Sequence, residues 1–258
     1  MKAAHNGSMQ LFFILTLSLS SLWGIDDLLL SEKLEIGPGI SGRQSIYVDQ
    51  GNFAQFVPII IAKYENFYAE GDKAALIFHD FELGDTSFWT EIVALYRQQG
   101  FIDAKGALSD LDDRKDAIEM GVALGIASES FGLINVSLAY DVIDTHKGSA
   151  ITLNYEIPIV LGDLIIRPVF SVQSMSKNLA NYYFGVKSSE VVAGRPAYDI
   201  TKATNYSWGY DLKYLMDDNW RITHSVEITN LDNTITKSPL VEYNANIQIS
   251  LGLVYDFF

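Results

Sequence analysis

The end of the chain alternates regularly between two kinds of residue, and this alternation limits the possible folds. From Ala245 to Phe257 every second residue is Ala, Ile, Ile, Leu, Leu, Tyr and Phe, whereas the intervening residues are mostly polar or small. A period of two residues predicts a β-strand with one apolar face and one polar face. The segment is about twice the usual strand length of roughly five or six residues. We therefore expect a large sheet or a barrel.

The same period recurs through the second half of the chain and is less regular in the first half. A short strand at Phe67–Glu70, after a turn at Glu65–Asn66, completes a set of twelve strands, and ten is the alternative number. The other predicted strands are Leu34–Gly42, Phe56–Tyr64, Ala75–Phe81, Phe88–Arg97, Ile118–Ile126, Ile134–Val142, Ile151–Ile159, Ile165–Gln173, Trp208–Met216, Trp220–Thr229 and the terminal strand.

The connections between these strands alternate between tight turns and long loops. The turns include Ser128–Gly132, Leu161–Asp163 and Met216–Asn219, and the loops between them extend to some thirty residues, as in 175–205. Outer-membrane barrels have short periplasmic turns and longer extracellular loops. A soluble β-sandwich, the alternative for alternating strands, has no reason to keep this rhythm. The expected fold class is all-β: a transmembrane antiparallel up-and-down β-barrel.

The N-terminus and the composition fit an exported protein. Residues 11–22 form a short apolar run after Lys2, which predicts a signal peptide over 1–24 with an undefined cleavage site. A single barrel domain is expected over 25–258. No apolar run is long enough for a transmembrane helix, and the absence of cysteine excludes disulfides and thiol chemistry. The net charge of -14 argues against nucleic-acid binding.

A series of short motifs, taken in their order and spacing, resembles the MipA/OmpV family of MltA-interacting outer-membrane proteins. The matching positions are Asp112, Asp113, Arg114, Asp141, His146, Lys147, Gly148, Arg167, Pro168, Tyr182, Tyr183, Gly185, Glu190, Tyr198, Ser238, Pro239 and the segment 254–257. The resemblance implies a barrel in the outer membrane of a Gram-negative bacterium, without catalytic residues or a cofactor. One member of the family is described as a scaffold between a lytic transglycosylase and a peptidoglycan synthase, and others look like porins or adhesins.

The last residues are interpreted as an assembly signal. Tyr255 and Phe257 share the apolar face of the terminal strand, whereas Phe258 falls on the other face and extends one residue beyond it. Barrels of this kind end in a lipid-facing aromatic that the barrel-assembly machinery reads. The strand itself is expected to pair with the first strand, so that no edge is left in the lipid.

The polar faces of the strands carry charges that would line a lumen. Six acids and three bases share these faces: Glu119, Asp141, Glu156, Asp211, Glu227 and Asp256, with Arg167, Lys213 and Arg221. An aqueous lumen with this excess of acids would be mildly cation-selective. In the alternative interpretation the charges pair with one another and plug a narrow barrel.

Three other segments have both a functional and a purely structural explanation. His146 and Ser149 could form a hydrolase pair, the acidic loop Leu108–Asp116 could bind Ca²⁺, and the aromatics of 181–185 could stack on a sugar. We interpret all three as parts of folded or solvated loops. Two function hypotheses follow: a scaffold contacting outer-membrane lipid and a murein hydrolase and synthase complex, or a small-solute porin.

Overall fold

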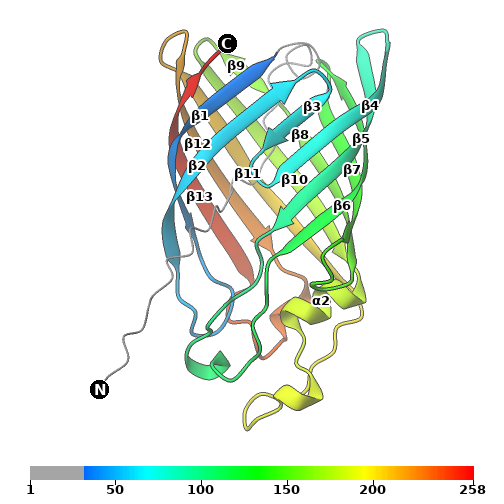
Figure 1. The fold of residues 1–258 in the computed structure, drawn as a ribbon, viewed down its shortest axis with the longest axis vertical. Helices are drawn as coiled ribbons and strands as arrows, with labels where there is room; N and C mark the ends of the chain where they lie inside the picture. Colours follow the sequence, from blue (N-terminus) through cyan, green and yellow to red (C-terminus); the bar gives the residue numbers. More distant parts are fainter. Residues whose placement is uncertain (1–31) are drawn as a thin grey trace, which may run out of the picture.

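The computed structural model describes residues 32–258, so the predicted signal peptide lies outside the described residues. The strands form one closed antiparallel barrel, because β1 (Lys33–Arg43) pairs with β13 (Ala245–Asp256) (Figure 1). The remaining strands are β2 (Phe53–Tyr64), β3 (Phe67–Glu70), β4 (Lys73–Leu83), β5 (Thr86–Arg97), β6 (Ala117–Ser128), β7 (Gly132–Asp141), β8 (Ser149–Glu156), β9 (Ile159–Leu161), β10 (Leu164–Met175), β11 (Ala203–Leu215) and β12 (Trp220–Asn230).

The wall contains twelve strands, because β8 and β9 are two parts of one strand that both pair with β10. The predicted continuous strand Ile151–Ile159 is interrupted at Ile157 and Pro158. Proline has no backbone N–H to donate, and only Ile157 N keeps a bond there, to Pro168 O. The predicted fold class and strand number are confirmed, including the four-residue strand β3 and the turn before it.

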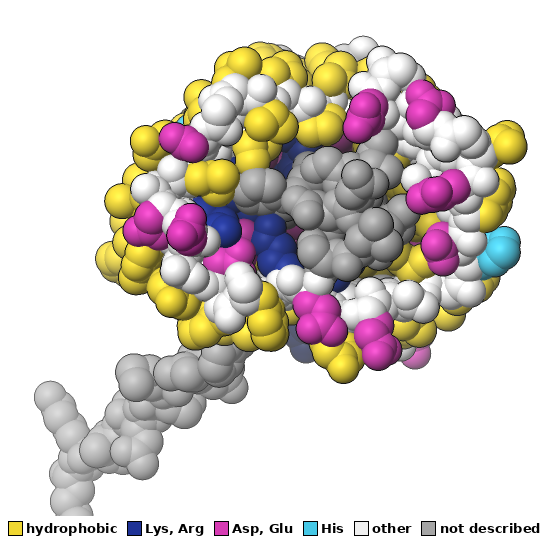
Figure 2. Space-filling model, turned by 90° about the horizontal axis from the view of Figure 1, so that it is seen from above, with side chains coloured by type: hydrophobic (Ala, Val, Ile, Leu, Met, Phe, Trp, Pro, Cys, Tyr) yellow, Lys and Arg dark blue, Asp and Glu magenta, His cyan; other side chains and the backbone are white. Residues whose placement is uncertain are grey.

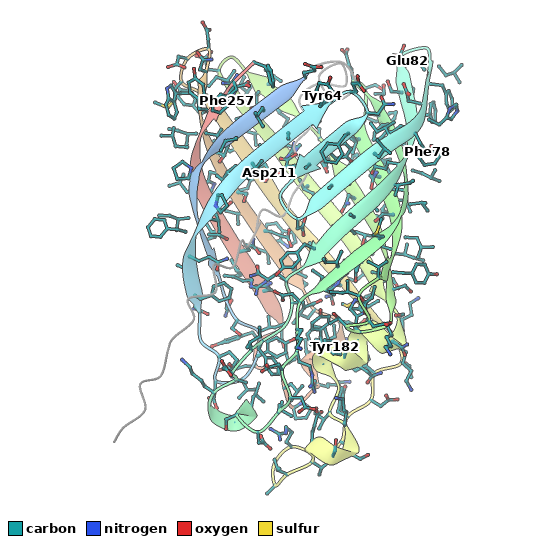
Figure 3. All side chains as sticks on the ribbon, in the orientation of Figure 1. Tyr64, Phe78, Glu82, Tyr182, Asp211 and Phe257 are labelled. Atoms are coloured by element: carbon teal, nitrogen blue, oxygen red, sulfur yellow. The ribbon has the colours of Figure 1, made fainter. Side chains whose placement is uncertain are left out.

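The two faces of each strand follow the predicted alternation. On β8, Ile151 and Leu153 are 53% and 41% exposed, as expected for side chains that point away from the barrel. Figure 3 shows Tyr64, Phe78 and Phe257 pointing outward from the wall. Inward positions hold the buried charges described below. Among residues 32–258, none of the helices is long or apolar enough to cross a membrane.

The two ends of the barrel differ in the length of their connections. The C-terminus lies at the end with short turns, and α2 (Lys177–Phe184) lies among the long loops at the opposite end (Figure 1). By the usual architecture of such barrels the short-turn end is periplasmic and the long-loop end extracellular. The connection between β3 and β4 departs from the predicted rhythm, since it is a tight turn at Gly71 and Asp72 on the loop side.

Candidate functional site

The long loops fold together into a cap over the extracellular end of the barrel. Helix α2 supplies Leu179, Ala180, Tyr183 and Phe184, all of which are completely buried. Residues from three other loops, and from the rest of the loop that contains α2, pack against them: Ile46, Tyr47, Phe101, Leu108, Leu111, Val186, Ile200, Ile235 and Leu240. The hydroxyl of Tyr47 also donates to Tyr183 O at 3.3 Å. The cap is therefore a packed apolar core and not a set of loose loops.

Two arginines fasten the loops of the cap to one another. Arg114 donates to Glu190, with Nη2 2.8 Å from Oε1, and both residues are buried. Burial alone would raise the pKa of Glu190, but hydrogen bonds from Lys187 N and from Arg114 outweigh it and hold this pKa below its ordinary value. Arg195 reaches the other side of the same loop and donates to Asp110 at 2.8 Å. Its hydrogen bonds lower the pKa of Asp110.

His146 connects the cap to the lumen. Gly148 N donates to its Nδ1 at 3.0 Å, so the neutral ring carries its proton on Nε2. Nε2 lies 3.0 Å from Glu119 Oε1, and Arg97 also donates to Glu119, with Nε at 2.7 Å. The carboxylate of Asp141 accepts from the backbone N–H groups of His146 and Lys147, which fixes the loop after β7. His146 and Asp141 thus hold the loop after β7 in place.

A second charge cluster lies on the inner wall of the barrel, on the adjacent strands β8, β10 and β11. Arg167 is 4% exposed and lies between two acids: its Nη2 is 2.6 Å from Asp211 and its Nε is 3.3 Å from Glu156. Each of the three residues comes from a different, neighbouring strand. The register pairs Arg167 directly with Asp211.

A third cluster lies toward the periplasmic end and joins β1 to the last strands. Glu35 is completely buried and pairs with Lys33 at 3.0 Å and Lys213 at 2.8 Å. Arg221 lies 3.4 Å from Glu35 and 2.9 Å from Asp256. Viewed from the short-turn end, Lys and Arg side chains lie inside the ring of strands, and Asp and Glu side chains stand around the rim (Figure 2).

Glu227 is the predicted lumen charge without an ion pair among residues 32–258. Its carboxylate accepts from the hydroxyl of Thr229 at 2.8 Å. It lines a cavity of about 640 Å³ between the charge clusters and the cap, together with Glu119, Glu156 and polar residues of β7, β8 and β10. The arrangement is a polar cavity with paired charges on its wall.

Several partners in these clusters were missed by the sequence analysis. Glu35, Arg97 and the Lys73–Glu91 pair (2.6 Å) belong to the N-terminal half, where alternation is irregular. A usable signal was present for Glu35, which stands between the apolar residues Leu34 and Ile36 on a strand. A charge at such a position needs a partner when it is buried.

Many of the residues that carried the family resemblance lie in the cap, whereas Arg167, Pro168 and 254–257 lie on or beside strands of the barrel wall. Tyr182 accepts a hydrogen bond from Lys115 N at 2.8 Å, and Ser238, before Pro239, donates to Phe184 O at 2.6 Å. A Cβ added to Gly185 would lie 2.6 Å from Asn181 O, so no side chain fits there. Of the remaining positions, Asp112 is exposed, Asp113 accepts from Asp103 N, and Pro168 lies at the interruption between β8 and β9.

The alternative sites considered from the sequence are occupied by structural contacts. Both ring nitrogens of His146 are engaged as described, and Tyr183 and Phe184 are buried in the cap, unable to stack on a sugar. In the described part of the chain, no group of three or more His, Cys, Asp or Glu side chains is placed to hold a metal ion.

Comparison with known proteins identifies the family. The model of the family described as MltA-interacting protein MipA matches residues 36–257. The chain belongs to the MipA family. This MipA-family protein is 32% identical over 155 residues to outer membrane protein Omp26La of Vibrio anguillarum, and the match spans 60% of each chain. It is 25% identical over 233 residues to the MltA-interacting protein of Escherichia coli (strain K12), covering 87% of this chain and 90% of that protein.

Among solved structures, the protein is similar to an outer membrane channel from Pseudomonas putida F1, at 12% identity and a TM-score of 0.42. This match covers 92% of this chain and 100% of that chain. The family and the barrel together place this MipA-family protein in the outer membrane, as the resemblance implied. The predicted family is likewise confirmed.

Proposed function

We propose that this MipA-family protein is a non-enzymatic scaffold whose periplasmic rim binds an enzyme of peptidoglycan remodelling. The observation that carries the proposal is an unpaired strand edge at that rim. Beyond Leu76 and Ile77, β4 pairs only with β5, and residues 78–83 have no strand on their other side among the described residues. Figure 3 shows Glu82 at the tip of this hairpin, beyond the turn that follows Tyr64.

The exposed edge carries apolar side chains. Phe78, Phe81 and Leu83 are 58%, 51% and 72% exposed, and the rings of Phe81 and Phe88 stack at 4.9 Å. An unpaired strand is a ready template for a strand from another chain. A relative is named MltA-interacting protein, and the match covers most of both chains. The edge offers more surface than the short turns elsewhere on the rim.

The lumen gives weaker support to an open pore. Glu119, Glu156, Asp211 and Glu35 each have an arginine or lysine nitrogen within 3.3 Å. The cap packs over the extracellular end, with Tyr183 and Phe184 completely buried. Paired charges and a packed cap favour a surface role over ion conduction.

Site-specific cross-linking tests the scaffold. A photoreactive amino acid replaces Phe81 in cells that also produce a tagged lytic transglycosylase. The expected result is a covalent product with that enzyme. The matched control places the same amino acid at Ile102, which is 54% exposed in an extracellular loop and should give no product. Equal products at both positions, or none at either, would contradict the proposal.

The second candidate is a mildly cation-selective pore, and the cavity of about 640 Å³ with Glu227 on its wall favours it. Single-channel recording on the reconstituted barrel tests this role. If ions pass, Glu227→Lys should shift selectivity toward anions, because a fixed charge sets the local counter-ion population. The paired Asp211 is a poorer test, since its substitution would also leave Arg167 without its closest acid.

A further inference from the structure

The wall of the barrel is incomplete on its extracellular half between β2 and β5. Within β2, strand β3 pairs only with Ile61–Tyr64. The segment 53–60 of β2 therefore has no strand on the side opposite β1 within residues 32–258. The tight turn at Gly71 and Asp72 ends the β3–β4 hairpin halfway along the wall (Figure 1). We call this opening the window; its borders are β2 residues 53–60, the turn 70–73, β5 residues 95–97 and the loop 98–102.

The window is held open at its extracellular border and does not collapse. Arg43 Nη1 donates to Gln98 O at 2.6 Å, which joins the far sides of the window. Gln50 and Asp49 bond to the backbone of Lys105 and Ala107, so the loops that follow β1 and β5 are tied together. The window is thus a bounded hole and not an open seam.

Pro58 fits the absence of a neighbouring strand. Tyr64 and Phe67 flank a two-residue turn and form its hydrogen-bonded pair, so even-numbered residues of β2 direct their backbone groups toward β3 or the window. The missing N–H of Pro58 therefore falls on the open side, where proline is tolerated. Backbone that faces no neighbouring strand is stable at membrane depth only where it is covered by protein or lines a water-filled cavity.

The cavity of about 640 Å³ reaches every border of the window. Its lining includes Phe53 of β2, Asp72 of the turn, Leu95 of β5 and Ile102 of the loop. The cap closes the extracellular end of the barrel, and the Glu35 cluster lies toward the periplasmic end. The window therefore leads from this cavity sideways into the outer half of the membrane.

The chemistry at the window indicates what could pass. Outside, Phe56 is 86% exposed on the lipid-facing side of β2. At the border itself, Phe53 and Ile102 line the cavity and are 38% and 54% exposed. Inside, the guanidinium of Arg43 lies 4.9 Å from the ring centroid of Phe53 and has no carboxylate partner among the described residues. The geometry points to a lateral portal through which a small amphiphile with an anionic head enters the cavity from the membrane, with its head on Arg43.

The first experiment tests the route. The chain has no cysteine, so single cysteines report cleanly in protein purified from outer membranes and returned to liposomes. Leu95→Cys borders the window, and Gln173→Cys lines the same cavity from β10. A maleimide tethered to lipid should label Leu95→Cys at least tenfold faster than Gln173→Cys, whereas a small water-soluble maleimide should label both. Equal lipid-tethered labelling, or no lipid-tethered labelling of Leu95→Cys, overturns the lateral route.

The second experiment tests the ligand with a laurate that carries a photoreactive diazirine. Cross-links should map to β2 residues 53–60 and to 95–102. Arg43→Gln should weaken laurate binding about tenfold to a hundredfold, the loss expected for one hydrogen bond to a charged group. Arg43→Lys should restore part of it, and neutral dodecyl maltoside should be unaffected. Lys177→Gln, on the exposed outside of the cap, is the matched control.

Other occupants of the window give distinguishable results. Disulfide-linked dimers through Phe56→Cys would show that a second copy of the chain covers the edge, and they would overturn the portal. Laurate binding unchanged by Arg43→Gln would overturn the assignment of the head group. Heat-modifiable migration on gels verifies that each variant is a folded barrel before either experiment is interpreted.

Discussion

Arg114 and Glu190 lie 76 residues apart in sequence and join two loops of the cap, with Arg114 Nη2 2.8 Å from one carboxylate oxygen and 2.9 Å from the other. Arg114 is 1% exposed, so the pair is isolated from water.

Arg114→Met should open the cap without unfolding the barrel. The substitution leaves the buried carboxylate of Glu190 without its cation, a change that typically costs about 3–5 kcal/mol. Limited proteolysis should then cut within 186–202, while the barrel keeps its heat-modifiable migration. Lys177→Gln is the control, because Lys177 and its partner Asp199 are both exposed and such pairs contribute little. Equal cleavage of both variants would contradict the prediction.

Acid should weaken the same contact. The pKa of Glu190 is depressed in the folded protein, so its charge stabilises the cap above the ordinary Glu pKa of about 4.3 and this contribution is lost as pH falls through the lower folded value. Hydrogen exchange of 186–202 should therefore rise on acidification from pH 7 to below about pH 4. In Glu190→Gln the contact is already weakened at pH 7, and the acid-induced rise should be smaller. A rise of the same size in both proteins would assign the effect to other groups.

The lipid-facing side of β8 should not tolerate a charge. Leu153 is 41% exposed on the outer face, whereas Asn154 lines the cavity. Arginine at a midplane lipid-facing site costs about 2–4 kcal/mol, so Leu153→Arg should impair assembly far more than Asn154→Arg. The yield of heat-modifiable barrel in outer membranes measures this. The opposite order would reverse the faces of the strand.

The assembly signal should depend on Phe257 and not on Phe258. Phe257 N still donates to Leu34 O at 3.0 Å and its ring packs at 4.9 Å from Tyr255, whereas β13 has already ended at Asp256. Deletion of Phe258 should leave assembly nearly intact. Phe257→Ala combined with that deletion should abolish most of it. Loss of folding on deletion of Phe258 alone would show that the terminal residue is part of the signal.

The sequence was most informative where side chains alternate without interruption. The strands around Leu153 and Ile249 were predicted from their period, because one face meets lipid along its whole length. The four-residue strand at Phe67 was predicted because an even number of strands required one more, and because turn-forming residues precede it. The bounded window could not be predicted, since it depends on which strands lack a neighbour, and that is decided by pairing across the whole barrel.

The partners of the lumen charges were equally hidden. Arg167 and Asp211 were assigned to one polar face, but the register that places them side by side links residues 44 positions apart. Glu35 pairs with Lys213 across 178 positions, which closure of the barrel alone brings together. Alternation indicates that a charge points inward; it carries no information on which opposite charge it meets.

Because the β3–β4 hairpin is short, the barrel wall has more strands at its periplasmic end than at its extracellular end. The periplasmic rim is built from the full set of strands, whereas the outer leaflet is crossed by two fewer, because this hairpin stops halfway. Residues added to or removed from its tip at Gly71 and Asp72 would change the height of the hole in the wall and leave the register of every other strand pair untouched. The size of this opening can therefore vary independently of the barrel that surrounds it.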